Sequence, residues 1–203
     1  DINGIKTLYN KYSKSNSMSF AHHPNTWLLE KYKYDILSIY TNRKIDEATT
    51  SYFGYDISII STGNEIIYYK VLNIEPKRDS YYSNDLELNA LQKKYYAHYY
   101  DSLKIDELEG DIGFIYGTYC GIAGSIIKER EELEFALENN NIDFLNHWLS
   151  KPFIELKMYA YEGFLKLKKK GLRITSKQLI LLNEFEKINE LINVCEGCMV
   201  ENI

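Results

Sequence analysis

The sequence has few of the residues that mark specialised classes of protein. Its 203 residues include only 3 prolines and 11 glycines, which excludes collagen-like and low-complexity chains. Its 3 cysteines are too few for a disulfide-rich scaffold. Basic residues do not dominate, because 24 Lys and Arg against 29 Asp and Glu give a formal net charge of −5. We therefore expect no nucleic-acid partner.

The chain also lacks an apolar run long enough to cross a bilayer. The nearest candidate is residues 112–127, sixteen residues without a charged side chain. At about 1.5 Å per residue a helix of this length covers roughly 24 Å, less than the hydrocarbon core of about 30 Å. Gly113, Gly117 and Gly121 recur in it at every fourth position, a spacing that lets helices approach closely in lipid or in a protein core. We expect no membrane span.

What the sequence does have is the composition of a globular protein with a surplus of tyrosine. Hydrophobic residues make up 45% and charged residues 26% of the chain, which suits one domain or two small parts that share a core. We place these parts at residues 1–104 and 105–203. The 19 tyrosines serve either as core residues with a polar end or as rigid contacts on a binding surface.

Residues 55–74 carry the clearest β signal, since two arms rich in β-branched and aromatic residues flank Gly63-Asn64. This pattern predicts a β-hairpin. Elsewhere the periodicity predicts helices, at residues 27–41, 85–103, 105–119, 125–139, 142–150, 152–170 and 175–190. The glycines at 110–124 favour close helix packing, with a break near Gly121–Gly124 as the alternative. The predicted fold class is α+β and predominantly α, with one β-hairpin packed on a helical stack.

The most regular of these helices opens at Pro152. Its buried face is formed by Leu156, Tyr159, Ala160, Gly163, Phe164 and Leu167. Three lysines before Gly171 place positive charge at the negative end of the helix and glycine just after it. Thr175 or Ser176 then caps the last predicted helix.

Residues 144–167 form a short helix, a Ser-Lys-Pro turn and a longer helix, and they resemble one repeat of the HEAT or armadillo type. The matching residues are Leu145, Leu149, Pro152, Ala160 and Leu165 or Leu167. With the flanking helices the resemblance covers residues 125–190, and it implies a HEAT-like stack that serves as a binding scaffold. Followed by the Cys-x-x-Cys tail, this pattern is also similar to small exported proteins of Bacteroidota, a resemblance that implies no activity.

The tail segment Cys195-Glu196-Gly197-Cys198 offers the most specific spacing of thiols. A zinc site needs four ligands, and Cys120 and the four histidines lack the spacing to complete one. A redox site needs the pair at the start of a helix that follows a strand. We favour a local disulfide between Cys195 and Cys198, with two free thiols as the alternative. A bridge slightly favours export to the periplasm or beyond over the cytoplasm. We expect no metal and no cofactor.

Two groups of residues are candidates for catalysis by a small hydrolase. His22-His23 lies in a segment that we expect to be a polar loop, where the histidines are solvated or cap the next helix. Glu107, Glu109 and Asp111 place three carboxylates near one helical turn, most simply as a solvated face at a helix N-terminus. No nucleophile, metal-binding or phosphate-binding motif accompanies either group.

Tyr95, Tyr96, Tyr99 and Tyr100 cover more than one face of a predicted helix. A single buried stripe cannot take up all four, so we expect Tyr96 and Tyr100 to be partly exposed. With Tyr81 and Tyr82 they form our predicted binding surface. The sequence therefore favours a non-enzymatic module that binds another protein, such as an immunity protein or an exported accessory protein. The alternative is the hydrolase, and the oligomeric state is left open.

Overall fold

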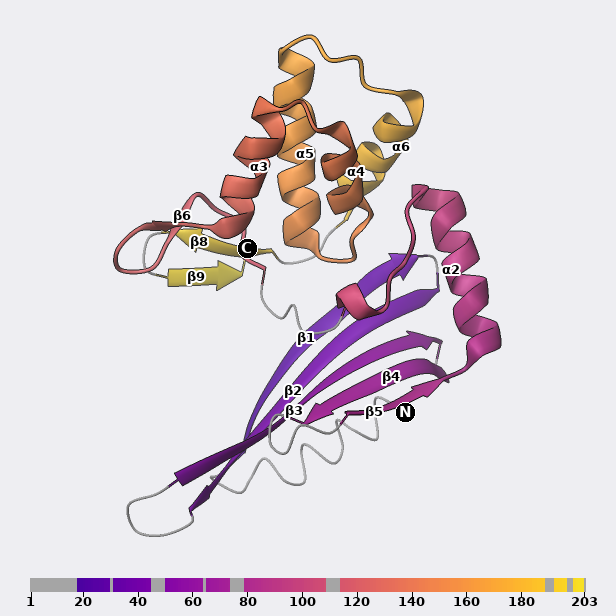
Figure 1. Cartoon of the computed structure of the whole chain (residues 1–203), viewed down its shortest axis with the longest axis vertical. Coiled ribbons are helices and arrows are strands. Elements are labelled where there is room, and N and C mark those ends of the chain that lie inside the picture. The colour runs from indigo at the N-terminus through magenta and orange to yellow at the C-terminus, as the bar shows by residue number, and fades with distance from the viewer. Residues whose placement is uncertain are drawn as a thin grey trace. The chain divides into compact units, whose positions relative to one another are not determined.

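The computed structural model describes the chain in segments that form two compact units. The described residues are 18–29, 31–44, 50–63, 65–73, 79–108, 114–188, 192–196 and 199–202. Unit 1 is Asp1–Asp111 and unit 2 is Ile112–Ile203, a boundary close to the predicted one after residue 104. Each unit is described by itself (Figure 1). That the two parts share one core stays a prediction.

Unit 1 contains a five-stranded antiparallel sheet in which each strand pairs with the next along the chain (Figure 1). Its strands are β1 (Met18–Leu29), β2 (Tyr32–Lys44), β3 (Thr50–Thr62), β4 (Glu65–Asn73) and β5 (Asp79–Ser83). Thr62 pairs with Glu65, and Gly63 between them has a φ of +59°, a conformation that glycine adopts without strain. The predicted hairpin at residues 55–74 is therefore confirmed as β3 and β4.

The predicted helix at residues 27–41 is wrong, because β2 occupies most of this segment. β2 lies between β1 and β3, and every residue from Tyr34 to Ser38 is buried. A central strand buried on both faces shows no alternation of polar and apolar residues. Its hydrophobic pattern can then be mistaken for that of a buried helix.

Helix α2 (Asp85–Tyr99) packs on this sheet and confirms the helix predicted at 85–103. The side chain of Asn84 accepts a hydrogen bond from the Glu87 N–H and so caps the helix. Leu91 and Tyr95 form its buried side. The helix ends at Tyr99, and the capping residue Tyr100 has a φ of +54°.

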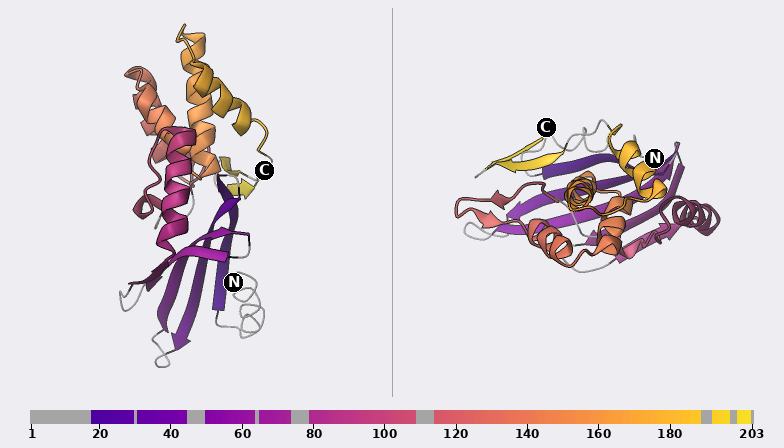
Figure 2. Two further views of the ribbon diagram at one scale, coloured as in Figure 1. Left: turned by 90° about the vertical axis from the view of Figure 1, so that its right-hand side faces the viewer. Right: turned by 90° about the horizontal axis from the view of Figure 1, so that it is seen from above.

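Unit 2 is built around helix α5 (Ile154–Lys169), which contacts α3 (Lys128–Glu138) and α4 (Ile142–Ser150) (Figures 1 and 2). Gly163 allows the close approach, since a Cβ there would lie 2.8 Å from a methyl carbon of Leu145. Gly171 has a φ of +94° just after α5. Thr175 and Gln178 form a capping box at the start of α6 (Ser176–Phe185). These features confirm the helices predicted in this part of the chain, except that α6 ends at Phe185, before the predicted end at residue 190.

The same unit contains two small β-hairpins, which the sequence did not predict. One joins β6 (Tyr119–Cys120) to β7 (Ser125–Ile126), and the other joins β8 (Asn193–Glu196) to β9 (Met199–Asn202). Gly121 and Gly124 have φ values of +84° and +61° in the turn between β6 and β7. The predicted break at these glycines is confirmed, and a helix continuing to residue 119 is wrong.

The predicted fold class is also wrong. A five-stranded sheet and two further hairpins make the protein an α+β mixture that is not predominantly α. A HEAT-like helical stack does not describe the C-terminal part, because its helices share the unit with strands. Among the described residues, no helix is both long and apolar enough to cross a membrane.

A buried tyrosine in unit 1 provides a test of this fold. The Tyr34 hydroxyl donates a hydrogen bond to the carbonyl of Leu108, and both residues are buried. We expect Tyr34→Phe to lower the free energy of unfolding by about 1–2 kcal/mol, since the carbonyl loses its donor away from water. Urea denaturation followed by far-ultraviolet circular dichroism measures this change.

The matched control is Tyr96→Phe, which removes the same atom from an exposed side chain. We expect its effect to stay within about 0.5 kcal/mol. Equal losses in the two variants would contradict the arrangement of Tyr34 and Leu108.

Candidate functional site

The four tyrosines of the predicted binding surface are all exposed in unit 1. Tyr81 and Tyr82 lie on β5, an edge strand of the sheet, and the Tyr82 ring stacks on Tyr69 with 5.7 Å between centroids. Tyr96 and Tyr100 lie at the C-terminal end of α2 with centroids 6.4 Å apart. The expected exposure of Tyr96 and Tyr100 is confirmed. Tyr96 and Tyr100 thus lie near each other, whereas Tyr81 and Tyr82, as successive residues of a strand, point to opposite faces of the sheet.

A residue that sequence reasoning missed extends this surface along α2. Leu86, in the first turn of the helix, is 81% exposed, while Tyr96 is 56% and Tyr100 65% exposed. At about 100° per residue, Leu86, Tyr96 and Tyr100 fall within an arc of about 80° around the helix, on the side away from the buried Leu91. We call Leu86, Tyr96 and Tyr100 the outer face of α2. Helical periodicity, with Leu91 and Tyr95 on the buried side, was the signal in the sequence.

The candidate catalytic residues are placed less completely. His22 and His23 belong to β1, opposite Leu37 and Ile36, rather than to the expected loop, and their side chains lie outside the described part of the structure. Glu107 accepts a hydrogen bond from Lys104 at 2.6 Å. Glu109 and Asp111 lie outside the described residues. Within the described ranges no group of three or more His, Cys, Asp or Glu side chains is arranged to hold a metal ion.

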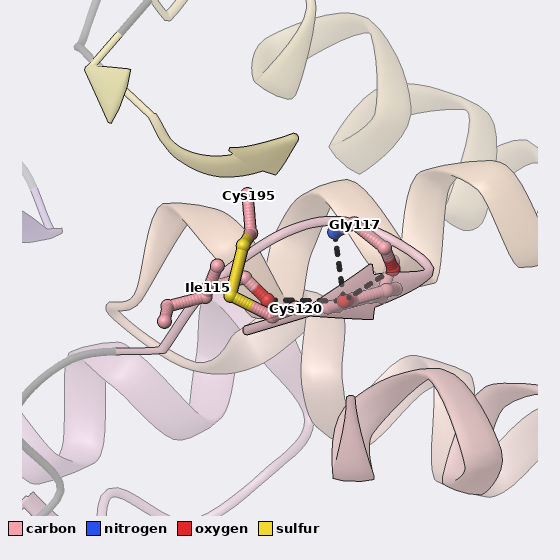
Figure 3. Close-up of a disulfide and its surroundings, with 5 residues drawn as sticks. Ile115, Gly117, Cys120 and Cys195 are labelled. Atoms are coloured by element: carbon pink, nitrogen blue, oxygen red, sulfur yellow. Dashed lines mark hydrogen bonds between the residues drawn. A yellow bond between two sulfur atoms is a disulfide. The ribbon is translucent and has the colours of Figure 1, made fainter. Parts of the chain in front are cut away.

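The disulfide of unit 2 differs from the one that the sequence favoured. Cys195 of β8 is bonded to Cys120 of β6, 75 residues away, with 5.6 Å between the Cα atoms (Figure 3). Cys198, the expected partner, lies outside the described residues. The pairing follows from the fold, because Tyr116 forms a β-bridge with Val194 and so brings the two segments together. Spacing along the chain does not reveal this contact.

Tyr159 holds the segment that leads into β6. Its side chain is fully buried, and its hydroxyl oxygen accepts the Gly117 N–H at 3.0 Å. The hydroxyl hydrogen faces two acceptors, the carbonyl oxygens of Ile115 at 3.0 Å and Gly117 at 2.9 Å (Figure 3). Burial raises the pKa of Tyr159 to about 12. The hydroxyl therefore stays protonated and keeps its role as donor.

Arg130 and Glu162 connect the same segment to the helices. The Arg130 guanidinium lies 2.7 Å from Glu162 Oε1 and donates from Nε to the Gly117 carbonyl at 3.0 Å. It also lies 4.9 Å from the centroid of the Tyr159 ring, within the range of a cation–π interaction. The side chain of Arg130 is 9% exposed. A charge this deeply buried needs these partners.

Glu162 is ionised although it is partly buried. Burial pushes its pKa upward, but hydrogen bonds from Arg130, Lys166 and Tyr116 outweigh that effect and lower the pKa to about 2. Tyr116 donates to Oε2 at 2.8 Å, and Lys166 Nζ lies 3.0 Å from Oε1. We call Arg130, Glu162, Tyr116, Tyr159 and Lys166 the clamp.

The residues of the clamp hold unit 2 together. Its carboxylate, guanidinium and hydroxyl groups bond to one another or to the backbone of residues 115–117. Comparison with known protein families, curated proteins and solved structures found no match to this chain. The function must therefore be argued from the surfaces of the two units.

The shifted pKa of Glu162 gives a pH-dependent test of the clamp. The folded pKa, about 2, lies below the ordinary value of 4.5, so Glu162 stabilises the fold above pH 4.5 and loses this effect as the pH falls toward 2. We expect Glu162→Gln to lower the free energy of unfolding by about 2 kcal/mol near neutral pH. Near pH 3 the loss should be less than half as large. Urea denaturation at the two pH values measures both losses.

The control substitution is Glu138→Gln at an exposed position of α3. We expect it to change the stability little at either pH. A loss for Glu162→Gln that stays constant from neutral to acid pH would contradict the assigned pKa shift.

Proposed function

We propose that this protein is a non-catalytic interaction module that binds another protein. The observation that carries the proposal is the outer face of α2, where Leu86, Tyr96 and Tyr100 are exposed together. Exposed apolar residues that share one face often mark a site of protein contact. Tyrosine is enriched at protein interfaces, because its ring offers a large apolar area and its hydroxyl a hydrogen bond.

The packing of α2 on the sheet favours binding through a helix that is already ordered before the partner arrives. Leu91 and Tyr95 fasten the opposite side of α2 in the core, and Asn84 caps its start. A partner that binds such a helix does not have to order it, so less binding free energy is lost on association. The preceding edge strand β5 adds the exposed Tyr81 and Tyr82.

The chemistry of the clamp supports binding over hydrolysis. Glu162 and Tyr159 have strongly shifted pKa values, which often mark catalytic groups. Here both residues hold backbone and side-chain partners within unit 2, and the deep burial of Tyr159 keeps its hydroxyl from water. Their shifts are those of a structural network.

We further propose that the module works in an oxidising compartment, as an exported periplasmic or extracellular protein. The Cys120–Cys195 disulfide supports this location, because disulfides persist outside the reducing cytosol. Cys195 is buried, so the bond belongs to the packed part of unit 2.

Affinity capture from cells that produce the protein tests the proposed interaction. The native chain and a variant with serine at Tyr81, Tyr82, Tyr96 and Tyr100 serve as paired baits. We expect a specific protein to be retained by the native chain and to be lost at least tenfold from the variant, since aromatic anchors carry much of the binding free energy. Circular dichroism verifies that the variant is folded.

The control bait carries serine at Leu179 and Ile180, two exposed apolar positions of α6. It should retain the same partner as the native chain. Identical sets of captured proteins from all three baits would contradict the proposal.

A further inference from the structure

The hairpin of β6 and β7 presents an apolar tip that the proposed function does not use. Ile122 is 96% exposed, and Tyr119 and Ile126 at the base of the hairpin are also exposed. A Cβ added at Gly121 or at Gly124 would meet no atom within 4 Å. The turn therefore stands clear of the rest of unit 2, and its loop extends to the side of α3 in Figure 1 and in the right-hand view of Figure 2.

Three contacts brace the turn at the tip. Gly124 N–H donates to the Gly121 carbonyl at 2.9 Å, and Cys120 pairs with Ser125 across the hairpin. The disulfide then ties Cys120, the residue next to the turn, to β8. The contacts on either side of the turn therefore position the exposed Ile122.

The hairpin also carries no charge. Residues 112–127 contain no Asp, Glu, Lys or Arg, although charged residues make up 26% of the chain. The polar residues beside the apolar ones, Thr118 and Ser125, are neutral. Contact with an apolar environment would therefore leave no charged side chain without water.

We propose that this hairpin is a shallow anchor to a lipid bilayer with zwitterionic headgroups. Ile122 and Ala123 enter the boundary between headgroups and acyl chains, and Tyr119 lies at headgroup depth. Tyrosine favours this interface because its ring is apolar and its hydroxyl polar. The anchor touches one leaflet only, since the uncharged segment forms a hairpin and not a membrane-spanning helix.

Two features favour lipid over a pocket in a partner protein. Tyr119 is paired with Ile126, so their exposed side chains share one face of the hairpin. Ile122 adds an apolar side chain at the tip, which stands clear of the rest of unit 2 and can therefore be covered by lipid. The rim of charged and polar contacts that usually fixes a protein interface is missing from this hairpin. The chain's net charge of −5 disfavours anionic lipid, which leaves zwitterionic lipid as the occupant.

Flotation with phosphatidylcholine vesicles tests the anchor, with the native full-length chain as the reference. We expect the native chain to float with the vesicles and Ile122→Ser to lower the partition coefficient roughly tenfold, because the largest inserted side chain is lost. The matched control is Ile180→Ser on α6, where isoleucine is 56% exposed, and it should partition like the native chain. Binding should be the same at low and high salt, because no charge takes part.

A second measurement locates the contact. The emission of an Ile122→Trp variant, corrected for that of the native chain, should shift to the blue on adding vesicles, whereas that of Ile180→Trp should not. Equal flotation of native chain and Ile122→Ser, or no flotation of the native chain, would overturn the proposal. If the native chain does not float, the tip would instead be expected to insert into a pocket of a partner protein.

Discussion

The ion pair between Arg130 and Glu162 is the interaction on which unit 2 depends. A guanidinium that is nearly buried is costly unless it is paired, and its partner is a carboxylate on the central helix α5, 2.7 Å away. The same guanidinium bonds to the backbone of residue 117. One charge therefore joins α3, α5 and the extended segment that leads into the hairpin of β6 and β7. Gly117 allows this fit, because a Cβ there would lie 2.9 Å from the carbonyl oxygen of Cys195.

In unit 1 the sheet supports helix α2, whose outer face is exposed. Residues 34–38 of β2 are buried on both sides, so the sheet provides a packed platform. Helix α2 packs its inner side on this platform and leaves its outer face in water. Both units thus combine a tightly held interior with apolar residues at defined exposed positions. This combination leads to the proposal of a binding module with a separate lipid contact.

The sequence predicted the elements whose signals are local. The helix opened by Pro152, the capping box at Thr175 and the hairpin at Gly63 depend on residues a few positions apart, and all three were found. Strand β2 was missed because burial on both faces removes the alternation of polar and apolar residues that marks a strand. The glycines at 117, 121 and 124 were ambiguous, since small residues serve both close helix packing and tight turns. Arg130 with Glu162, and Cys120 with Cys195, are contacts between distant residues that no local pattern shows.

The central claim is that β6 and the segment before it are fastened to strand β8, and the disulfide tests it most directly. Digestion of the unreduced protein after glutamate separates Cys195, in residues 191–196, from Cys198, in residues 197–201, and leaves Cys120 in residues 110–129. Mass spectrometry should find residues 110–129 linked to residues 191–196, with residues 197–201 unlinked. A link between residues 191–196 and 197–201 would contradict the account, because β8 would then lack its covalent bond to β6.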